Sequence, residues 1–178
     1  MGGRFEYKYF SDIDVTDPFF DSLKRDYEGF ETEWFPKCAR EGRQALVFSD
    51  EHGLGAFVAM KRENEPILLK NGEYPATPRL KVCTLLLAER FRGQRLGEGA
   101  IGLVLWKWQA LKLDEVYVTV YPTHADLISQ LRKFGFIDVA DAILTGSWCL
   151  SEVVRTSISA IPTNRSPSLI PSLQRADT

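Results

Sequence analysis

The sequence predicts an α/β fold, with a mixed, twisted sheet and helices on its faces. Two observations lead to this class. Strand-like runs rich in β-branched and aromatic residues alternate with helical patterns along the chain. One such run, residues 80–87, is almost continuously apolar, which is typical of a central strand covered on both faces. With 178 residues, 44% of them hydrophobic, the chain can bury one sizeable core, which excludes disorder over most of its length.

The first forty residues predict one strand and two helices. Residues 4–10 form a short aromatic run of strand length. Asp17 and Pro18 indicate a helix start, because aspartate caps free N–H groups and proline suits the first helical position. A second helix is expected over residues 30–40. The apolar faces are formed by Phe19, Leu23 and Tyr27 in the first helix and by Phe30, Trp34 and Cys38 in the second.

The middle of the chain predicts a hairpin, a loop and the central strand. Residues 44–49 and 54–61 are strand-like and flank a turn signal, Asp-Glu-His-Gly, at 50–53. Residues 62–78 are charged and rich in turn-forming residues, so a loop is expected there. The central strand, residues 80–87, follows this loop.

The second half continues the alternation. Residues 98–112 are helical and almost wholly apolar, so this helix is expected to be buried. Residues 115–121 form a β-rich run. Residues 125–134 predict a short helix, which Gly135 ends at a C-cap position.

Two further strands are expected at residues 136–144 and 148–157. Beyond them serine, threonine and proline dominate the composition. We therefore expect one domain over residues 1–160 and an irregular tail over residues 161–178.

Composition and charge exclude several classes of protein. The 22 Lys and Arg residues nearly balance 24 Asp and Glu, which disfavours a strongly basic nucleic-acid binder. The three cysteines are widely spaced, so they indicate neither a disulfide framework nor a zinc site, and no metal is expected. The start of the chain lacks the apolar run of a signal peptide, and no window reaches the ~18 apolar residues of a membrane span. These features predict a soluble cytoplasmic protein without membrane contact.

One segment combines positive charge and glycine between a strand and a helix. Residues 79–135 carry a net charge of +4, and Arg92 and Arg95 lie within the strand-to-helix loop. Gly93 and Gly97 let the backbone approach a ligand closely. A helix N-terminus offers unpaired N–H groups that suit a phosphate. The segment therefore predicts a phosphate or pyrophosphate site.

Two other phosphate-binding motifs fit poorly. A P-loop ends in Gly-Lys-Ser/Thr, which this loop lacks. Residues 97–102 match the Gly-x-Gly-x-x-Gly pattern of dinucleotide-binding proteins, but they lie inside the predicted helix. The next strand also lacks the terminal carboxylate that holds a ribose hydroxyl. A nicotinamide dinucleotide is therefore disfavoured, and Gly99 and Gly102 are expected to permit close helix packing.

Residues 85–97 resemble motif A of the GNAT superfamily of acyl-CoA-dependent N-acyltransferases. The family signature is Gln/Arg-x-x-Gly-x-Gly/Ala. Arg92 fills its first place and Gly97 its last, while Arg95 replaces the middle glycine. The ending Arg-Lys-Phe-Gly-Phe at 132–136 is similar to the family's x-Lys-x-Gly-Phe. Within the superfamily, the chain looks most like a branch of GNAT domains associated with PIN or ASCH domains.

The resemblance, over about residues 40–140, implies a mostly antiparallel sheet whose fourth and fifth strands splay apart, with acetyl-CoA in the gap. Backbone groups of Leu85 and Leu87 would pair with the pantetheine arm, and N–H groups of residues 94–97 would hold the pyrophosphate. An amine of the acceptor would attack the thioester directly. The CoA-binding residues that the resemblance implies are Leu85, Leu86, Leu87, Arg92, Gly93, Gln94, Arg95, Leu96, Gly97 and Glu98.

The catalytic side chains are less well specified. Many members of the family place a tyrosine four residues before the Gly-Phe pair, and here that position is Leu131. His124 stands where the family often has an asparagine; it either shuttles a proton, contacts CoA or caps the following helix. Tyr121 is the other candidate, as a catalytic group or as a partly buried strand aromatic. Cys83 is expected in the core, since no base that would activate its thiol is apparent.

The resemblance implies an enzyme, an N-acetyltransferase that transfers the acetyl group of acetyl-CoA to a primary amine of an unidentified acceptor. Two alternatives stay open. One is a toxin-type acetyltransferase of aminoacyl-tRNA, which would make tRNA a partner. The other is a non-catalytic acyl-CoA-binding module, suggested by the missing tyrosine at position 131. A homodimer is also left open.

Overall fold

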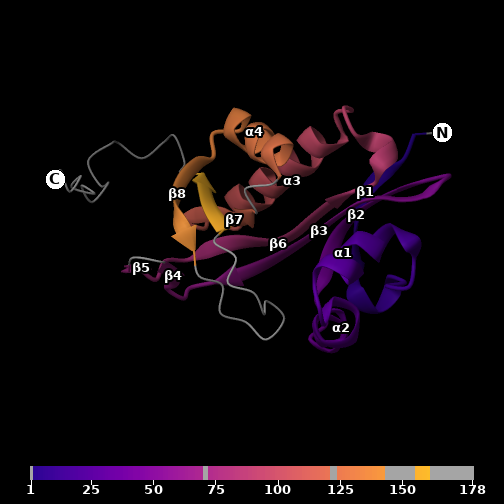
Figure 1. The fold of residues 1–178 in the computed structure, drawn as a ribbon, viewed down its shortest axis with the longest axis horizontal. Helices are drawn as coiled ribbons and strands as arrows, with labels where there is room; N and C mark the ends of the chain where they lie inside the picture. The colour runs from indigo at the N-terminus through magenta and orange to yellow at the C-terminus, as the bar shows by residue number, and fades with distance from the viewer. Residues whose placement is uncertain (1, 70–71, 121–123, 143–154, 161–178) are drawn as a thin grey trace.

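The computed structural model describes residues 2–69, 72–120, 124–142 and 155–160, which form one nine-stranded sheet with helices on both faces (Figure 1). The strands are β1 (Arg4–Tyr9), β2 (Gln44–Asp50), β3 (Gly53–Glu63), β4 (Ile67–Leu69), β5 (Gly72–Tyr74), β6 (Arg79–Leu87), β7 (Glu115–Val120), β8 (Ile137–Ala142) and β9 (Arg155–Ala160). The α-helices are α1 (Asp21–Asp26), α2 (Phe35–Arg40), α3 (Leu96–Ala110) and α4 (Ala125–Lys133).

The strand order in the sheet is β1-β2-β3-β6-β7-β9-β8-β4-β5. The neighbouring strands pair antiparallel, with the exception of β6 and β7, which are parallel. This is the mixed, mostly antiparallel sheet that the sequence analysis expects. In the order of that expectation, β6 and β7 take the places of the fourth and fifth strands.

The two faces of the sheet bury different side chains. α3 and α4 lie on one face, and α1 and α2 on the other (Figure 1). Under α3 and α4 the core is mainly aliphatic, with Val58, Leu80, Val82, Ile101, Val104, Val118 and Leu131 among its buried members. Under α1 and α2 it is aromatic, with Phe10, Phe20, Phe30, Trp34, Phe35 and Phe57. Their rings meet in edge-on geometry in several pairs, for example at 4.9 Å between the centroids of Phe10 and Phe35.

The local signals at helix ends act as predicted. The carboxylate of Asp17 accepts a hydrogen bond from the Phe19 N–H at 2.8 Å, and Pro18 opens a short 3-10 helix that leads into α1. At the end of α4, Gly135 adopts φ +87°, a left-handed conformation that glycine reaches at little cost. Helix α4 therefore ends where the sequence indicates.

Two predicted elements differ from the structure. The loop expected at residues 62–78 is wrong, because β3 continues to Glu63 and a hairpin of β4 and β5 follows. These two strands have three residues each, and β4 gains a partner in β8 at Leu69 and Ala142, a pairing that local sequence does not indicate. The helix expected at residues 30–40 begins with a π-helical turn, Phe30–Trp34, in which the Trp34 N–H bonds the Gly29 carbonyl at 2.9 Å.

The last strands are shifted relative to the prediction. β8 begins at Ile137, and β9 begins at Arg155, later than the 148–157 expected from the sequence. Residues 143–154 and the predicted tail at 161–178 lie outside the described residues.

Candidate functional site

β6 and β7 run side by side over only part of their lengths. Residues 79–82 pair with residues 115–118, and beyond that point the described partner of β7 is β9. The separation begins at a β-bulge. Val82 and Thr84 face adjacent residues of β3, so Cys83 between them is the extra residue. A bulge bends and twists its strand, and here it coincides with the last pair between β6 and β7.

The open part of β6 presents backbone groups on the side that β7 has left. The Ala88 N–H donates to the Gly55 carbonyl at 2.9 Å, which identifies this pair as a hydrogen-bonded one. Because such pairs alternate along an antiparallel ladder, the register turns the backbone of Leu86 toward β3. The backbone groups of Leu85 and Leu87 then face away from β3. No described strand pairs with them, so this edge can accept an extended ligand.

The side chains beside this opening are apolar. A small pocket of about 10 Å³ lies between the separating strands and the two helices. Its lining consists of Val82, Leu85, Ile101, Val104, Val118, Leu127, Leu131 and Phe136. A space of this size holds about one water molecule. It is a gap in the packing beside the opening, and the ligand edge itself is the backbone of β6.

The loop after β6 brings a helix N-terminus to the end of this edge. Gly93 has φ +73°, and α3 starts at Leu96 with no side chain capping its first turn. The Gln94 N–H donates to the Phe91 carbonyl at 3.1 Å, so this amide is already engaged. The amides of Arg95, Leu96, Gly97 and Glu98 belong to the cap and first turn, which have no partner within the helix. Together they form a cradle of N–H donors suited to an anion.

The arginines around the cradle differ in the contacts that their side chains already make. Arg92 is 79% exposed and contacts only Glu89, at 3.4 Å, among the described residues. Arg95 is exposed and makes no ion pair within the described part of the chain. Arg90 is held by the Asp50 carboxylate at 2.9 Å and the Gly53 carbonyl at 3.2 Å. The charges available to a ligand therefore come from Arg92 and Arg95, while the Glu98 carboxylate works against them.

Gly97 is buried at the point where the cradle meets α4. A Cβ atom at this position would lie 3.0 Å from Gln130 Oε1 and 3.0 Å from a methyl group of Leu87. Gln130 is therefore a polar neighbour of the cradle that the sequence analysis missed. Its only sequence signal is its place in the helix before the Gly-Phe pair, since its approach to Gly97 depends on how α3 and α4 pack.

The three positions considered for catalysis differ in burial and in whether the structure describes them. Leu131 is 3% exposed and belongs to the aliphatic core, so it supplies no proton-transfer group. His124 is exposed and occupies the N-cap position of α4; its carbonyl accepts the Ile128 N–H at 3.1 Å, but its side chain does not cap the helix. Tyr121 lies outside the described residues. The structure therefore leaves both catalytic assignments as predictions.

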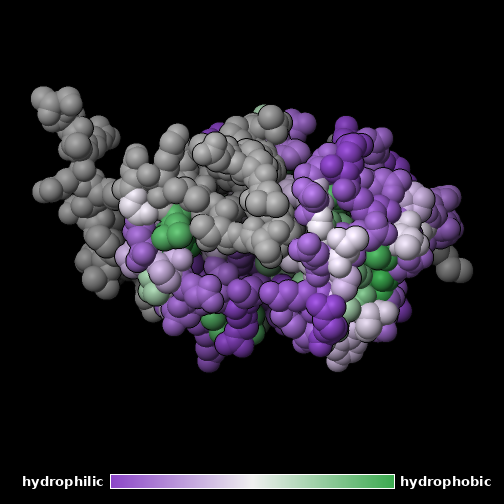
Figure 2. All heavy atoms as spheres, turned by 60° about the horizontal axis from the view of Figure 1, so that its bottom comes forward, coloured by the Kyte–Doolittle hydropathy of each residue, from purple (hydrophilic) through white to green (hydrophobic). Residues whose placement is uncertain are grey.

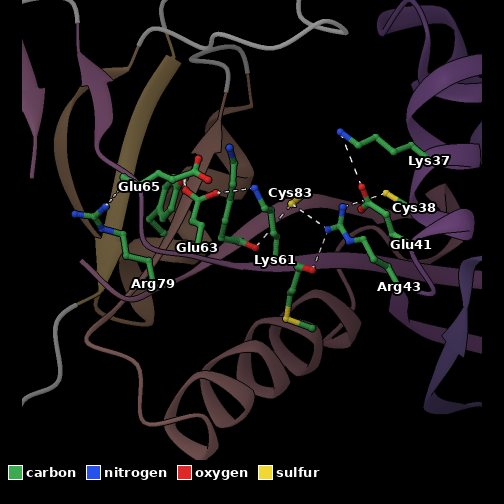
Figure 3. A network of polar contacts seen from close by, with 12 residues as sticks. Lys37, Cys38, Glu41, Arg43, Lys61, Glu63, Glu65, Arg79 and Cys83 are labelled. Carbon is green, nitrogen blue, oxygen red and sulfur yellow. Dashed lines mark hydrogen bonds and ion pairs between the residues drawn. The ribbon is translucent and has the colours of Figure 1, made fainter. Parts of the chain in front are cut away.

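A polar network lies on the other face of the sheet beside the bulge (Figure 3). The Arg43 guanidinium donates to Cys38 Sγ at 3.1 Å and to the Met60 carbonyl at 3.1 Å, and it approaches Cys83 Sγ at 3.8 Å. Burial raises the pKa of the Cys83 thiol and brings that of Cys38 to about 11. Both thiols are therefore protonated near neutral pH. Cys83 packs against the aromatic core, as expected of a residue that is not a nucleophile.

A buried carboxylate lies further along the same face. Glu63 has an 8% exposed side chain, accepts a hydrogen bond from the Tyr117 hydroxyl and contacts Lys61 at 3.8 Å. Burial and the bond to Glu63 raise the pKa of Tyr117, so its phenol stays protonated. This pair could not be predicted from the sequence, because its two residues come from β3 and β7 and are 54 positions apart. On the face of the molecule that Figure 2 shows, most of the surface of the described residues is hydrophilic.

The described ranges contain neither a candidate metal cluster nor a candidate membrane span. No group of three or more His, Cys, Asp or Glu side chains in those ranges could hold a metal ion. None of the described helices is long and apolar enough to cross a bilayer.

Solved structures provide the similarity that sequence comparison does not. No family model and no curated protein sequence matches the chain. A Salmonella typhimurium protein solved with its cofactor acetyl-CoA superposes with a TM-score of 0.62 at 9% identity, covering 93% of this chain and 97% of that one. An acetyltransferase of the GNAT family from Streptococcus agalactiae gives 0.59 at 14% identity, covering 90% and 96%.

A third similar structure is a chain of the NatC complex bound to Gag peptide and CoA. Its TM-score is 0.60 at 14% identity, covering 92% of this chain and 100% of that one. At such low identities these similarities establish the fold: the chain has the GNAT acyltransferase fold, with β6 and β7 as its splayed pair.

Proposed function

We propose that the chain is an N-acetyltransferase that transfers the acetyl group of acetyl-CoA to a primary amine. One observation carries the proposal. The open edge of β6, at Leu85 and Leu87, runs directly toward the uncapped N-terminus of α3. An extended arm ending in a pyrophosphate is the kind of ligand that matches an edge and an anion cradle in this order. Acetyl-CoA has this shape, and structures of the same fold were solved with acetyl-CoA or CoA.

In this proposal the parts of the site have separate roles. The outward N–H and C=O groups of Leu85 and Leu87 pair with the amides of the pantetheine arm, as an added strand would. The amides of Arg95, Leu96 and Gly97 receive the pyrophosphate, and the Arg92 and Arg95 guanidinium groups add long-range attraction. The bulge at Cys83 supports this arrangement because it accompanies the divergence of β6 from β7.

The proposed reaction is a direct attack of the amine on the thioester. A bond forms between the amine nitrogen and the acetyl carbon, the carbon–sulfur bond breaks, and the sulfur leaves as a thiolate that takes up a proton. The amine loses one proton, for which we assign His124 as the acceptor, directly or through water, with Tyr121 as the competing assignment. We assign the polarisation of the carbonyl oxygen to a backbone N–H near Leu85. No covalent enzyme intermediate is needed, in keeping with the protonated Cys83.

Binding can be tested by calorimetry with acetyl-CoA on three variants of glycines in α3. Gly97→Asp places a carboxylate beside Gln130 and Leu87, next to the cradle amides, and its charge should repel the pyrophosphate; we expect the affinity to fall by roughly a hundredfold. Gly97→Ala adds the same Cβ atom without the charge, and its loss should be much smaller. Gly102→Asp adds the charge where the structure leaves open space, and its affinity should be close to that of the unmodified chain. Absence of millimolar binding by the folded unmodified chain would refute the proposal.

A second candidate function is a non-catalytic acyl-CoA-binding module. The burial of Leu131 favours it, because the position used by many acyltransferases for a tyrosine acid is part of the core here. Release of free thiol from acetyl-CoA with a panel of primary amines distinguishes the two functions. Amine-dependent release supports the transferase, whereas tight acetyl-CoA binding without release by any amine supports the module.

A further inference from the structure

The first strand forms an open edge of the sheet. β1 is the terminal strand of the sheet order, and no described strand pairs with its outer side. The Phe10 N–H donates to the Arg43 carbonyl at 3.0 Å, which fixes the hydrogen-bonding phase between β1 and β2. The alternation of an antiparallel ladder then turns the backbone groups of Phe5, Tyr7 and Tyr9 outward. Such an edge is a template for another strand.

Aromatic side chains accompany this edge. Tyr7 is 39% exposed and Tyr9 is 50% exposed, both large values for aromatic rings on a strand. α3 lies over the same face: Gly99 lies close to the Phe5 ring, and Lys107 Nζ is 5.0 Å from the centre of the Tyr7 ring. Two of the most exposed aromatic rings in the described chain therefore belong to one unpaired strand.

We propose that β1 pairs antiparallel with β1 of a second copy of the chain, about a two-fold axis through Tyr7. The outward residues restrict the possible registers, because only Phe5, Tyr7 and Tyr9 can exchange backbone bonds across the edge. With the axis at Tyr7, the strand sequence is complementary to itself. Tyr7 faces Tyr7 of the partner subunit, and Phe5 faces the partner's Tyr9. On the opposite face Glu6 stands across from the partner's Lys8, and Lys8 across from the partner's Glu6.

The other registers are less favourable. An axis at Glu6 would place Glu6 opposite Glu6 of the partner subunit and Arg4 opposite the partner's Lys8, which repel. An axis at Lys8 would set Lys8 against Lys8 of the partner subunit. Axes at Phe5 or Tyr9 leave only a short overlap of the two strands, since β1 spans Arg4–Tyr9. Among the registers that the backbone phase allows, charge and strand length therefore select the one centred on Tyr7.

Variants of the edge and of its charged residues test the proposal, with the oligomeric state of the full chain measured by sedimentation velocity. The unmodified chain should sediment as a dimer of about 40 kDa, twice the 20.2 kDa of the monomer. Tyr9→Pro should give a monomer: the φ of Tyr9 is −66°, which proline adopts without strain, and the N–H that proline lacks faces outward. The control is Ile137→Lys, at an exposed residue far from β1 in the sheet order. This variant should remain dimeric.

The charge test is independent of any effect of proline on folding. Glu6→Lys and Lys8→Glu should each weaken the dimer by roughly tenfold, because each turns two attractive cross-strand pairs into repulsive ones. The double variant Glu6→Lys/Lys8→Glu restores opposite charges across the axis and should regain the affinity of the unmodified chain. A monomeric unmodified chain, or a double variant as weak as the single ones, overturns the proposal.

Disulfide trapping tests the register. In a hydrogen-bonded antiparallel pair the Cα atoms are about 5.5 Å apart, within the range of a disulfide. Oxidation with diamide should therefore link Tyr7→Cys into a covalent dimer. With Cys149 replaced by serine in every chain compared, Tyr9→Cys, whose cross-strand neighbour is the partner's Phe5, should not become linked, nor should the chain without an added cysteine. Linkage of Tyr9→Cys but not of Tyr7→Cys would show that this register is wrong.

Discussion

The two halves of β6 differ in how many of their edges are paired. The first half, residues 79–82, is paired on both edges, with β3 on one side and β7 on the other. The second half, residues 84–87, keeps β3 but has no described strand on its other edge. One bulged residue, Cys83, separates them. A central strand thus acquires an open backbone edge when one of its two ladders ends early.

The paired half is held by the most buried charge in the described chain. Arg79 is fully buried, and its Nε donates to the Glu115 carboxylate at 2.6 Å. Its other nitrogens donate to the carbonyls of Glu65, at 3.0 Å, and Pro75. The Tyr74 hydroxyl donates to the same carboxylate at 3.0 Å. This network ties the start of β6 to β7 and to the chain before it, so the strands diverge from a fixed point.

Removing Arg79 should therefore have the largest effect on stability. Arg79→Met leaves Glu115 without its cation in a largely buried site, and we expect the free energy of unfolding to fall by about 3–5 kcal/mol. Urea denaturation followed by circular dichroism measures it. The control is Lys37→Ala, which removes an exposed ion pair to Glu41 and should change stability by less than about 0.5 kcal/mol. Equal losses in the two variants would contradict the role given to the network.

A substitution at His124, in the proposed site beside the open half, should lower turnover without lowering stability. If His124 accepts the amine proton, His124→Ala lowers kcat by roughly 100-fold at saturating acetyl-CoA, the usual scale for a positioned base. Unfolding should be little changed, because the side chain is exposed and does not cap α4. Tyr121→Phe is measured beside it. A kcat of His124→Ala close to that of the unmodified enzyme, with a large loss in Tyr121→Phe, would assign the proton transfer to the tyrosine.

Cys38, which faces the same Arg43 guanidinium as the bulged residue Cys83, should give stability a pH dependence. Burial raises the pKa of the Cys38 thiol from 9.0 to about 11, so the folded chain keeps a proton that the unfolded chain loses earlier. The raised pKa of Cys38 contributes to the free energy of unfolding, and this contribution is fully present below pH 9. It falls by roughly 2 kcal/mol as the pH rises to about 11. Cys38→Ala should make the decline over this interval shallower. Identical slopes in both chains, measured by urea denaturation at several pH values, would exclude the effect.

The smallest expected effect is at the outer rim of the cradle. Arg92 is largely exposed, so Arg92→Ala should weaken acetyl-CoA binding by only about two- to fivefold, and less at high salt. Calorimetry at two salt concentrations measures the difference. Arg25→Ala, at an exposed residue on α1, serves as the charge-matched control and should leave binding unchanged. A salt-independent loss in Arg92→Ala would indicate a direct, desolvated contact instead of long-range attraction.

Features that depend on neighbouring residues could be predicted from the sequence. The apolar run of β6, the cap at Asp17 and the helix end at Gly135 all follow from local propensity, and the structure has each of them in place. The glycines and arginines before α3 likewise indicated an anion cradle, because a helix N-terminus carries free donors wherever the helix lies in the fold. The element order was accessible for the same reason, whereas the mostly antiparallel class of the sheet was implied by the resemblance to the GNAT superfamily.

The points at which strands meet and separate could not be predicted from the sequence and are known from the fold. The end of the β6–β7 ladder at Val82, the bulge at Cys83 and the approach of Gln130 to Gly97 each join segments that are distant in sequence. The burial of Arg79 and the short β4–β5 hairpin likewise depend on partners that local sequence does not reveal. The physical reason is that backbone pairing and side-chain burial are set by long-range packing, whereas caps, turns and strand propensity are set within a few residues.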